Sequence, residues 1–178
     1  MKWFKFSYLP LVVALGQATT SYAAEIPASP ADSWPMYRGS ASLTGLSKSK
    51  LSASLKPLWT FKAKEGFHGT AAIAEGMVFV GCDDGNLYAL DFKTGKKIWA
   101  FKTDDIVESA PLVKDSKVYF GSSDCFVYAL NAKDGKLLWK FETEDRVLGA
   151  PNFFQPKAKD AKPSVIVGSY DFKLYSLD

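Results

Sequence analysis

Short apolar runs alternate with turn-forming residues along most of the chain, a pattern that predicts strands. Residues 77–80 (Met-Val-Phe-Val) are continuously apolar, as in a strand covered on both faces. Asp84 and Gly85 follow as a hairpin turn signal, and residues 87–90 (Leu-Tyr-Ala-Leu) form the next apolar run. A second turn at 94–95 leads into a further strand. We therefore expect an antiparallel sheet joined by tight turns.

The same order of runs and turns recurs every 40 residues. Residues 69–103 align with 109–143 without a gap and are identical at twelve of 35 positions. A third copy begins at Gly149 and is displaced by seven residues after a Lys- and Pro-containing stretch at 155–164. The positions that recur in register are Trp59, Trp99 and Trp139; Gly81, Gly121 and Gly168; and Tyr88, Tyr128 and Tyr175.

Each copy predicts four strands, of which the innermost are short segments at 70–74 and 110–114. Several four-stranded antiparallel sheets about 40 residues apart are typical of a β-propeller, in which each sheet is one blade. The predicted fold is all-β, with about two and three-quarter blades within residues 55–178. Residues 55–62 are expected to supply one preceding Trp strand, which in a whole propeller would pair with C-terminal strands to complete the last blade. The repeated Trp is expected to be buried between neighbouring blades.

The first 23 residues have the pattern of a secretory signal peptide. Lys2 and Lys5 precede a short apolar stretch, and Ser21-Tyr22-Ala23 supplies small residues for cleavage after Ala23. An uncleaved anchor is the alternative, although the stretch is shorter than the about 20 residues that a membrane span requires. No cysteine lies directly after it to carry a lipid anchor at a mature N-terminus. Residues 24–54 are then a linker and lead-in, and we expect a periplasmic or secreted protein with no membrane span after cleavage.

The net charge of the chain bears on whether its partner is a nucleic acid. Loss of the two signal-peptide lysines takes the formal net charge from +3 to +1. Nucleic-acid binding calls for a clustered basic face, so we expect no nucleic-acid partner. Aromatic residues make up 15% of the chain, which suits strands packed on both faces.

The repeat resembles the pyrroloquinoline quinone (PQQ)-type propeller repeat. The resemblance rests on residues 78–81 (Val-Phe-Val-Gly), 87–91 (Leu-Tyr-Ala-Leu-Asp) and 94–99 (Thr-Gly-Lys-Lys-Ile-Trp). The lead-in at 34–39 (Trp-Pro-Met-Tyr-Arg-Gly) is similar to that of many exported bacterial proteins of this family, and the likeness covers about residues 34–178. The family includes BamB-type outer-membrane assembly factors and quinoprotein dehydrogenases, so the resemblance specifies the fold better than the activity.

Members of this family usually close a ring of seven or eight blades. The apolar faces of the two complete copies need stacked neighbours, so we expect the chain to be a fragment of a longer propeller. The alternative is a short protein that assembles between chains.

Two groups of residues are candidates for covalent or metal chemistry. Cys82 and Cys125 lie at the same edge of adjacent blades, where a disulfide or two free thiols are both open. Quinoprotein alcohol dehydrogenases carry adjacent cysteines beside the cofactor, which this sequence lacks. Asp84, Asp124 and Asp171 recur at one position, and a metal site or a turn carboxylate would explain them. Because every blade needs that turn, we favour the turn carboxylate and predict no metal.

The remaining polar candidates lie near the predicted axis. His68 is the only histidine, opposite Glu108 of the next repeat, and Arg146 lies near the equivalent place one blade later. We expect a lone loop histidine without a carboxylate or nucleophile partner, and solvated loop charges at the other two. The sequence therefore predicts no catalytic residue and no cofactor-binding residue.

Three functions follow from these expectations. The first is a non-catalytic BamB-like scaffold that binds a protein or ligand, with an outer-membrane assembly or cell-envelope component as partner. The second is the N-terminal part of a PQQ-dependent quinoprotein dehydrogenase with PQQ and Ca²⁺, as the resemblance implies. The third is a structural repeat protein without a small ligand.

Overall fold

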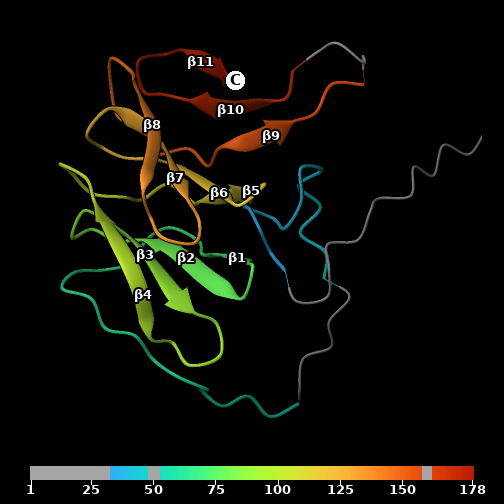
Figure 1. Cartoon of the computed structure of the whole chain (residues 1–178), viewed down its shortest axis with the longest axis vertical. Helices are drawn as coiled ribbons and strands as arrows, with labels where there is room; N and C mark the ends of the chain where they lie inside the picture. The colour runs from blue at the N-terminus through green and yellow to red at the C-terminus, as the bar shows by residue number, and fades with distance from the viewer. Residues whose placement is uncertain (1–32, 48–52, 158–161) are drawn as a thin grey trace, which may run out of the picture.

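The computed structural model describes residues 33–47, 53–157 and 162–178. The predicted signal peptide at 1–23 and much of the lead-in at 24–54 lie outside the described residues. Within those ranges the chain forms only strands, turns and irregular segments (Figure 1). None of the described residues belongs to a helix with the length and apolarity needed to cross a membrane.

Three antiparallel sheets follow one another along the chain and are named blades 1 to 3. Blade 1 has the order β1-β2-β3-β4, blade 2 the order β5-β6-β7-β8, and blade 3 the order β11-β10-β9. The strands are β1 (Ala72–Ala74), β2 (Met77–Gly81), β3 (Asn86–Asp91), β4 (Lys97–Lys102), β5 (Leu112–Lys114), β6 (Lys117–Gly121), β7 (Phe126–Asn131), β8 (Leu137–Glu142), β9 (Asn152–Phe154), β10 (Ser164–Gly168) and β11 (Leu174–Leu177). This arrangement confirms the prediction of an all-β fold of four-stranded antiparallel blades.

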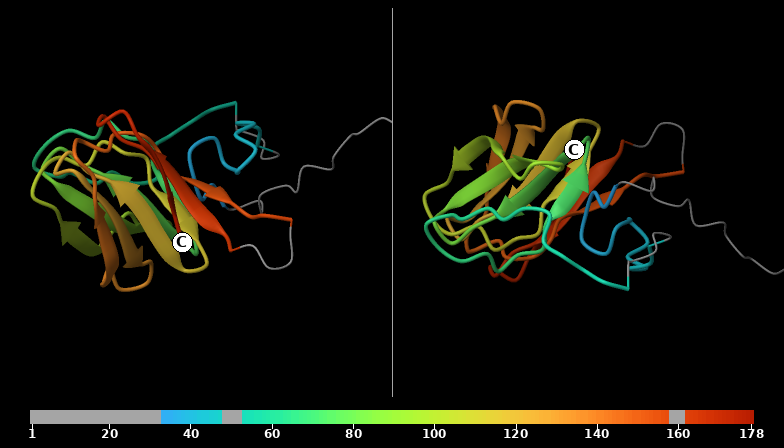
Figure 2. Two further views of the ribbon diagram at one scale, coloured as in Figure 1. Left: turned by 90° about the horizontal axis from the view of Figure 1, so that it is seen from above. Right: turned by 90° about the horizontal axis from the view of Figure 1, so that it is seen from below.

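Blades 1 and 2 repeat each other in hydrogen-bond register. Ala89 pairs with Trp99 in blade 1, and Ala129 pairs with Trp139 in blade 2. The register shifts directly after each alanine. The inner strands β1, β5 and β9 lie next to one another on one side of the molecule (Figures 1 and 2).

Apolar side chains fill the space between neighbouring blades. Phe79 of blade 1 and Phe120 of blade 2 are fully buried members of one cluster. A second cluster joins Val127 of blade 2 to Val167 of blade 3. Stacking therefore buries the apolar strand faces that a single blade would leave in water.

The repeated tryptophan fastens one blade to the next. The Trp99 Nε1–H donates to the carbonyl of Ala132 at 3.0 Å. A Cβ atom added at Gly135 would lie 2.7 Å from the Trp99 ring, so the bare glycine backbone lets the indole dock. Trp59 lies against Gly95 in the same way.

Residues 55–62 form no strand, although the repeat pattern predicted a Trp strand there. Strand geometry needs a hydrogen-bonded neighbour, and no described strand pairs with this segment. Its aromatic side chains nevertheless keep their expected role. Trp59 and Phe61 pack beside Tyr88, on the face of blade 1 that points away from blade 2. The Trp59 Nε1–H donates to the carbonyl of Phe92 at 2.9 Å.

The lead-in segment runs along the inner edges of the blades. Trp34 exchanges two backbone hydrogen bonds with Ile73 of β1, at 2.7 and 2.8 Å. The Val113 N–H of β5 donates to the carbonyl of Pro35 at 2.6 Å. Met36 is buried in the cluster shared by blades 2 and 3. The lead-in therefore pairs with blades 1 and 2 and packs into the cluster that blade 2 shares with blade 3. Figure 2 shows it running beside the blades.

Candidate functional site

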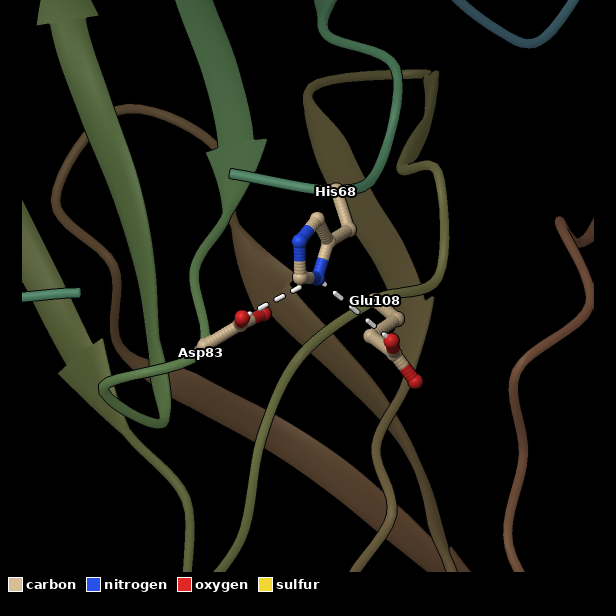
Figure 3. A group of neighbouring side chains, drawn as sticks. All are labelled: His68, Asp83 and Glu108. Atoms are coloured by element: carbon tan, nitrogen blue, oxygen red, sulfur yellow. Dashed lines mark ion pairs between the residues drawn. The ribbon is translucent and has the colours of Figure 1, made fainter. Parts of the chain in front are cut away.

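Three polar side chains converge beside the inner end of blade 1 (Figure 3). His68 lies in the loop before β1, Asp83 follows β2, and Glu108 lies in the segment that leads from β4 to β5. The Asp83 N–H donates to the carbonyl of Gly66 at 3.0 Å, which holds the two loops of blade 1 together. A Cβ atom added at Gly69 would lie 2.6 Å from the Glu108 carbonyl oxygen, so glycine lets the third segment approach.

The histidine lies between two carboxylates. His68 Nδ1 is 3.0 Å from Asp83 Oδ2 and 3.7 Å from Glu108 Oε1. The three ligand atoms lie within 4.8 Å of one another. The His68 side chain is 65% exposed, whereas those of Asp83 and Glu108 are 22% and 32% exposed. The site is therefore open to solvent on the histidine side.

The carboxylate of Asp83 is incompletely satisfied. Its Oδ1 atom is buried and has no hydrogen-bond partner among the described residues. Within the same ranges, no lysine or arginine forms an ion pair with Asp83 or Glu108. Buried polar atoms are normally paired, so the described residues leave this carboxylate one donor short.

The neighbouring thiol does not add a nucleophile. Burial is the main reason that the pKa of the Cys82 thiol is raised. Its Sγ donates to the Glu65 carbonyl at 3.5 Å. A buried protonated thiol is unreactive, because the thiolate is the nucleophilic form. The chemistry open to the site is therefore that of one imidazole nitrogen and two carboxylates.

The prediction of a lone loop histidine was wrong. His68 and Glu108 face each other as their repeat positions indicated, but both also meet Asp83, which sequence reasoning overlooked. Arg146 is not part of the site, because its guanidinium lies over the Tyr170 ring at 5.0 Å. The missed signal was a departure from the repeat. Ser123 stands at the position equivalent to Asp83 in blade 2.

The recurring aspartates have the turn role that we favoured. Asp84 Oδ1 accepts from the Asn86 N–H at 3.1 Å, and its Oδ2 accepts from the Tyr88 hydroxyl at 2.6 Å. Burial raises the pKa of Asp84, but the hydrogen bonds from Tyr88 and Asn86 outweigh it, so the pKa lies below the ordinary value. The same hydroxyl contact joins Tyr128 to Asp124 at 2.7 Å and Tyr175 to Asp171 at 2.6 Å. Each carboxylate is occupied within its own blade.

The carboxylates of blades 2 and 3 also reach the preceding connection. Asp124 Oδ2 accepts from the Asp104 N–H and Asp171 Oδ2 from the Glu144 N–H, each at 3.1 Å. Each of these aspartates therefore joins its turn to the segment that enters its blade.

The two cysteines do not form the candidate disulfide. Both thiols are free. Cys82 is buried against the loop at Glu65, and the Cys125 Sγ contacts the carbonyl of Ser123 at 3.9 Å within its own turn. Cys125 also occupies the left-handed turn position, with φ of 70°, where blade 1 has Gly85. The two side chains therefore point to different local partners although they lie in equivalent regions of adjacent blades.

Comparisons with known proteins agree with this architecture. A family model described as "Outer membrane protein assembly factor BamB" matches residues 50–178. No curated protein matches the chain. BamB from Moraxella catarrhalis is 22% identical with a TM-score of 0.57, and the match covers 68% of this chain and 36% of that one.

Dehydrogenases share the fold as well. Quinohemoprotein alcohol dehydrogenase from Comamonas testosteroni is 21% identical with a TM-score of 0.64, covering 83% of this chain and 25% of that one. A europium-containing methanol dehydrogenase is 19% identical with a TM-score of 0.61, covering 83% and 32%. The chain thus spans about a third of the BamB structure and about a quarter of the alcohol dehydrogenase.

Identity at this level shows the fold alone, which is an incomplete β-propeller. The family match covers most of the chain and includes all three blades. The chain therefore belongs to the PQQ-type propeller family described as outer membrane protein assembly factor BamB.

Proposed function

We propose that the chain is part of an exported, non-catalytic scaffold that binds an extended segment of a protein partner along an inner blade edge. The observation that carries this proposal is the backbone pairing between the lead-in and the inner strands. Strand addition of this kind obtains affinity from main-chain hydrogen bonds and specificity from alternate side chains.

The lead-in already uses two of three equivalent edge positions. Ile73, Val113 and Phe153 are the middle residues of β1, β5 and β9, and each pairs with a valine of the next strand. Ile73 exchanges two backbone bonds with Trp34, and Val113 donates to Pro35. The register therefore turns the backbone groups of these middle residues toward the axis.

The third position has no backbone partner within the described ranges. The Phe153 N–H donates only to the side chain of its neighbour Asn152, at 2.8 Å. Phe154 beside it is 57% exposed. A hollow lies between these residues and Ala41 and Ser42 of the lead-in. An unpaired edge next to an exposed aromatic and a hollow suits an incoming extended peptide.

The family supplies the class of partner. Its description names outer membrane protein assembly, so we infer a cell-envelope location and a protein partner of that system. Export through the signal peptide at 1–23 and cleavage after Ala23 belong to the same proposal. N-terminal sequencing of the protein recovered from its source cells tests the cleavage site.

A PQQ-dependent dehydrogenase is the competing function, because two dehydrogenases share the fold. The two free cysteines lie in different blades and do not provide the adjacent pair that the resemblance places beside the quinone. We therefore propose the scaffold ahead of the dehydrogenase for this part of the protein. Saturable PQQ binding together with dye-linked alcohol oxidation by the full-length protein would overturn the scaffold proposal.

The decisive variant for the scaffold is Phe153→Pro. Proline removes the N–H that faces the edge and is tolerated at edge positions whose N–H points outward. We expect Phe153→Pro to weaken binding of a fluorescent peptide with alternating apolar and polar residues by about tenfold, the effect of about 1.4 kcal/mol. Fluorescence anisotropy measures this change.

Phe153→Leu is the matched control, because it shortens the side chain and keeps the N–H. It should lose less affinity than the proline variant. Equal losses would show that the aromatic ring, and not strand addition, binds the peptide. A peptide with proline at every second position should fail to bind the wild-type protein.

A further inference from the structure

We propose that His68, Asp83 and Glu108 form a binding site for a first-row divalent metal ion, zinc by preference, which fastens blade 1 to the segment that enters blade 2. The proposal is independent of the scaffold function and of PQQ. It rests on the spacing of the ligand atoms, on the charge around them and on their places in the repeat.

The spacing of the ligand atoms fits a tetrahedral ion. Zinc binds imidazole nitrogen and carboxylate oxygen at about 2.0–2.2 Å, so a tetrahedron holds its ligand atoms about 3.3–3.6 Å apart. The distances from His68 Nδ1 to Asp83 Oδ2 and Glu108 Oε1 are 3.0 and 3.7 Å. Side-chain adjustments of a few tenths of an ångström would bring both distances into that range. The ligand oxygens of Asp83 and Glu108 lie within 4.8 Å of each other, so they would approach by up to about 1 Å on binding the ion.

The local charge favours a divalent cation. Two carboxylates meet here, and no lysine or arginine of the described chain pairs with either of them. The buried Asp83 Oδ1, which has no partner in the same part of the chain, shows that the histidine alone does not satisfy the group. A bound ion would offset the repulsion between Asp83 and Glu108 and polarise the free oxygen.

The ligand types favour zinc over calcium. One imidazole and two carboxylates suit first-row transition metals, whereas Ca²⁺ takes about six to eight oxygen ligands. The three protein ligands leave a fourth position, and the 65% exposure of the His68 side chain gives that position access to solvent. Water, or a donor from another molecule, would complete the coordination.

The ligand residues lie where the repeats differ from one another. Glu108 and Leu148 stand at the positions equivalent to His68 in blades 2 and 3. Ser123 stands at the position equivalent to Asp83 in blade 2. Blade 2 therefore lacks two of the three ligand types. Turn formation alone does not explain Asp83, because the neighbouring Asp84 already accepts the turn hydrogen bonds.

The test uses the protein without a histidine tag, because His68 is the only histidine within residues 1–178. Calorimetric titration with ZnCl₂ should show one saturable site, with weaker binding of CaCl₂. Loss of an outer-shell partner typically costs about 10–100-fold in metal affinity. Removing a ligand in His68→Ala, Asp83→Asn or Glu108→Gln should therefore weaken zinc binding at least about tenfold.

Two readouts separate a site from a surface effect. Glu142→Gln, an exposed carboxylate on β8, is the control and should bind zinc like the wild type. Long-range ¹H–¹⁵N spectra of the His68 imidazole should shift at Nδ1 on zinc addition, because Nδ1 faces the carboxylates. Thermal unfolding without metal checks that each variant is folded.

The outcomes are decisive in both directions. Saturable zinc binding that raises the Tm of the wild type and is lost in the three ligand variants supports the proposal. No saturable zinc binding, or binding unchanged in Asp83→Asn, would reduce the cluster to an ion pair. Peptide binding at Phe153 is measured separately, so a failure here leaves the scaffold test intact.

Discussion

At the residue scale, the Tyr88 hydroxyl connects the stability of blade 1 to pH. Burial, the hydrogen bond to Asp84 and the charge of that carboxylate raise the pKa of Tyr88 from 10.0 to about 12. The native state therefore favours neutral tyrosine more strongly than the unfolded chain does. The resulting stability is complete below pH 10 and is lost as the pH rises through about 12.

Tyr88→Phe tests this contact. The variant removes the donor to Asp84 Oδ2, and a hydrogen bond to a charged group contributes about 1.5–3 kcal/mol. We expect the free energy of unfolding to fall by an amount in this range at neutral pH, and the difference from wild type to narrow above pH 10. Urea unfolding at a series of pH values measures both effects. A difference that stays constant up to pH 11 or beyond would contradict this account.

Asp84 acts in the opposite pH range. Its pKa is lowered from 3.8 because the hydrogen bonds outweigh the effect of burial. Its contribution to stability is present above pH 3.8 and is lost as the pH falls through the lowered value. One hydrogen bond thus supports the blade at both ends of the pH range.

At the element scale, blade 1 is joined to blade 2 by an indole docked on a turn glycine. Gly135 has φ of +71°, and an added Cβ atom would lie 2.7 Å from the Trp99 ring. Gly76 has a similar φ of +73°, but an added Cβ atom would meet nothing within 4 Å. Both glycines therefore need a left-handed backbone conformation, but only Gly135 lies against a tryptophan ring.

Gly135→Ala and Gly76→Ala form a matched pair. Left-handed backbone costs a non-glycine residue about 1–2 kcal/mol, and both variants should lose this amount. Overpacking against Trp99 should add about 1–3 kcal/mol to the loss in Gly135→Ala only. Chemical unfolding gives the two free energies. Equal destabilisation would show that the indole moves aside and that the docking contributes little.

The strands could be predicted from the sequence because apolar runs and turns recur in register. The inner strands, the hairpins and the insertion after β9 all follow from that repeat. The strand expected at residues 55–62 depended on a neighbouring strand as well as on its own side chains, and none of the described strands pairs with it. Asp83 was missed for a related reason. The repeated Asp84 next to it explained the turn, and the contact between Asp83 and His68 depends on the three-dimensional approach of two loops.

At the scale of the whole molecule, the lead-in determines how the three blades hold together. Met36 is 4% exposed and belongs to the cluster that includes Tyr119 of blade 2 and Val165 of blade 3. Its neighbour Tyr37 is 45% exposed. The backbone pairs of Trp34 with Ile73 and of Pro35 with Val113 place this side chain between the blades.

Met36→Ala should destabilise the assembled blades. Truncation of a buried methionine typically costs about 2–5 kcal/mol, because it loses apolar contact and leaves a cavity. Tyr37→Ala is the control, with an expected change within about 0.5 kcal/mol for an exposed site. The free energy of unfolding from urea titration distinguishes them. A loss in Met36→Ala no larger than that in Tyr37→Ala would mean that the lead-in only lies on the surface.

The backbone pairing of the lead-in has a consequence for how the repeats relate to one another. Blades that contact only their neighbours are interchangeable, and such an array can gain or lose a unit without changing the rest. The lead-in makes the blades unequal. It forms backbone hydrogen bonds with the edges of β1 and β5, whereas the Phe153 N–H of β9 bonds, in the described part of the chain, only to the side chain of Asn152. The first two blades are thereby distinguished from the third, and one inner edge among similar units is unlike the others.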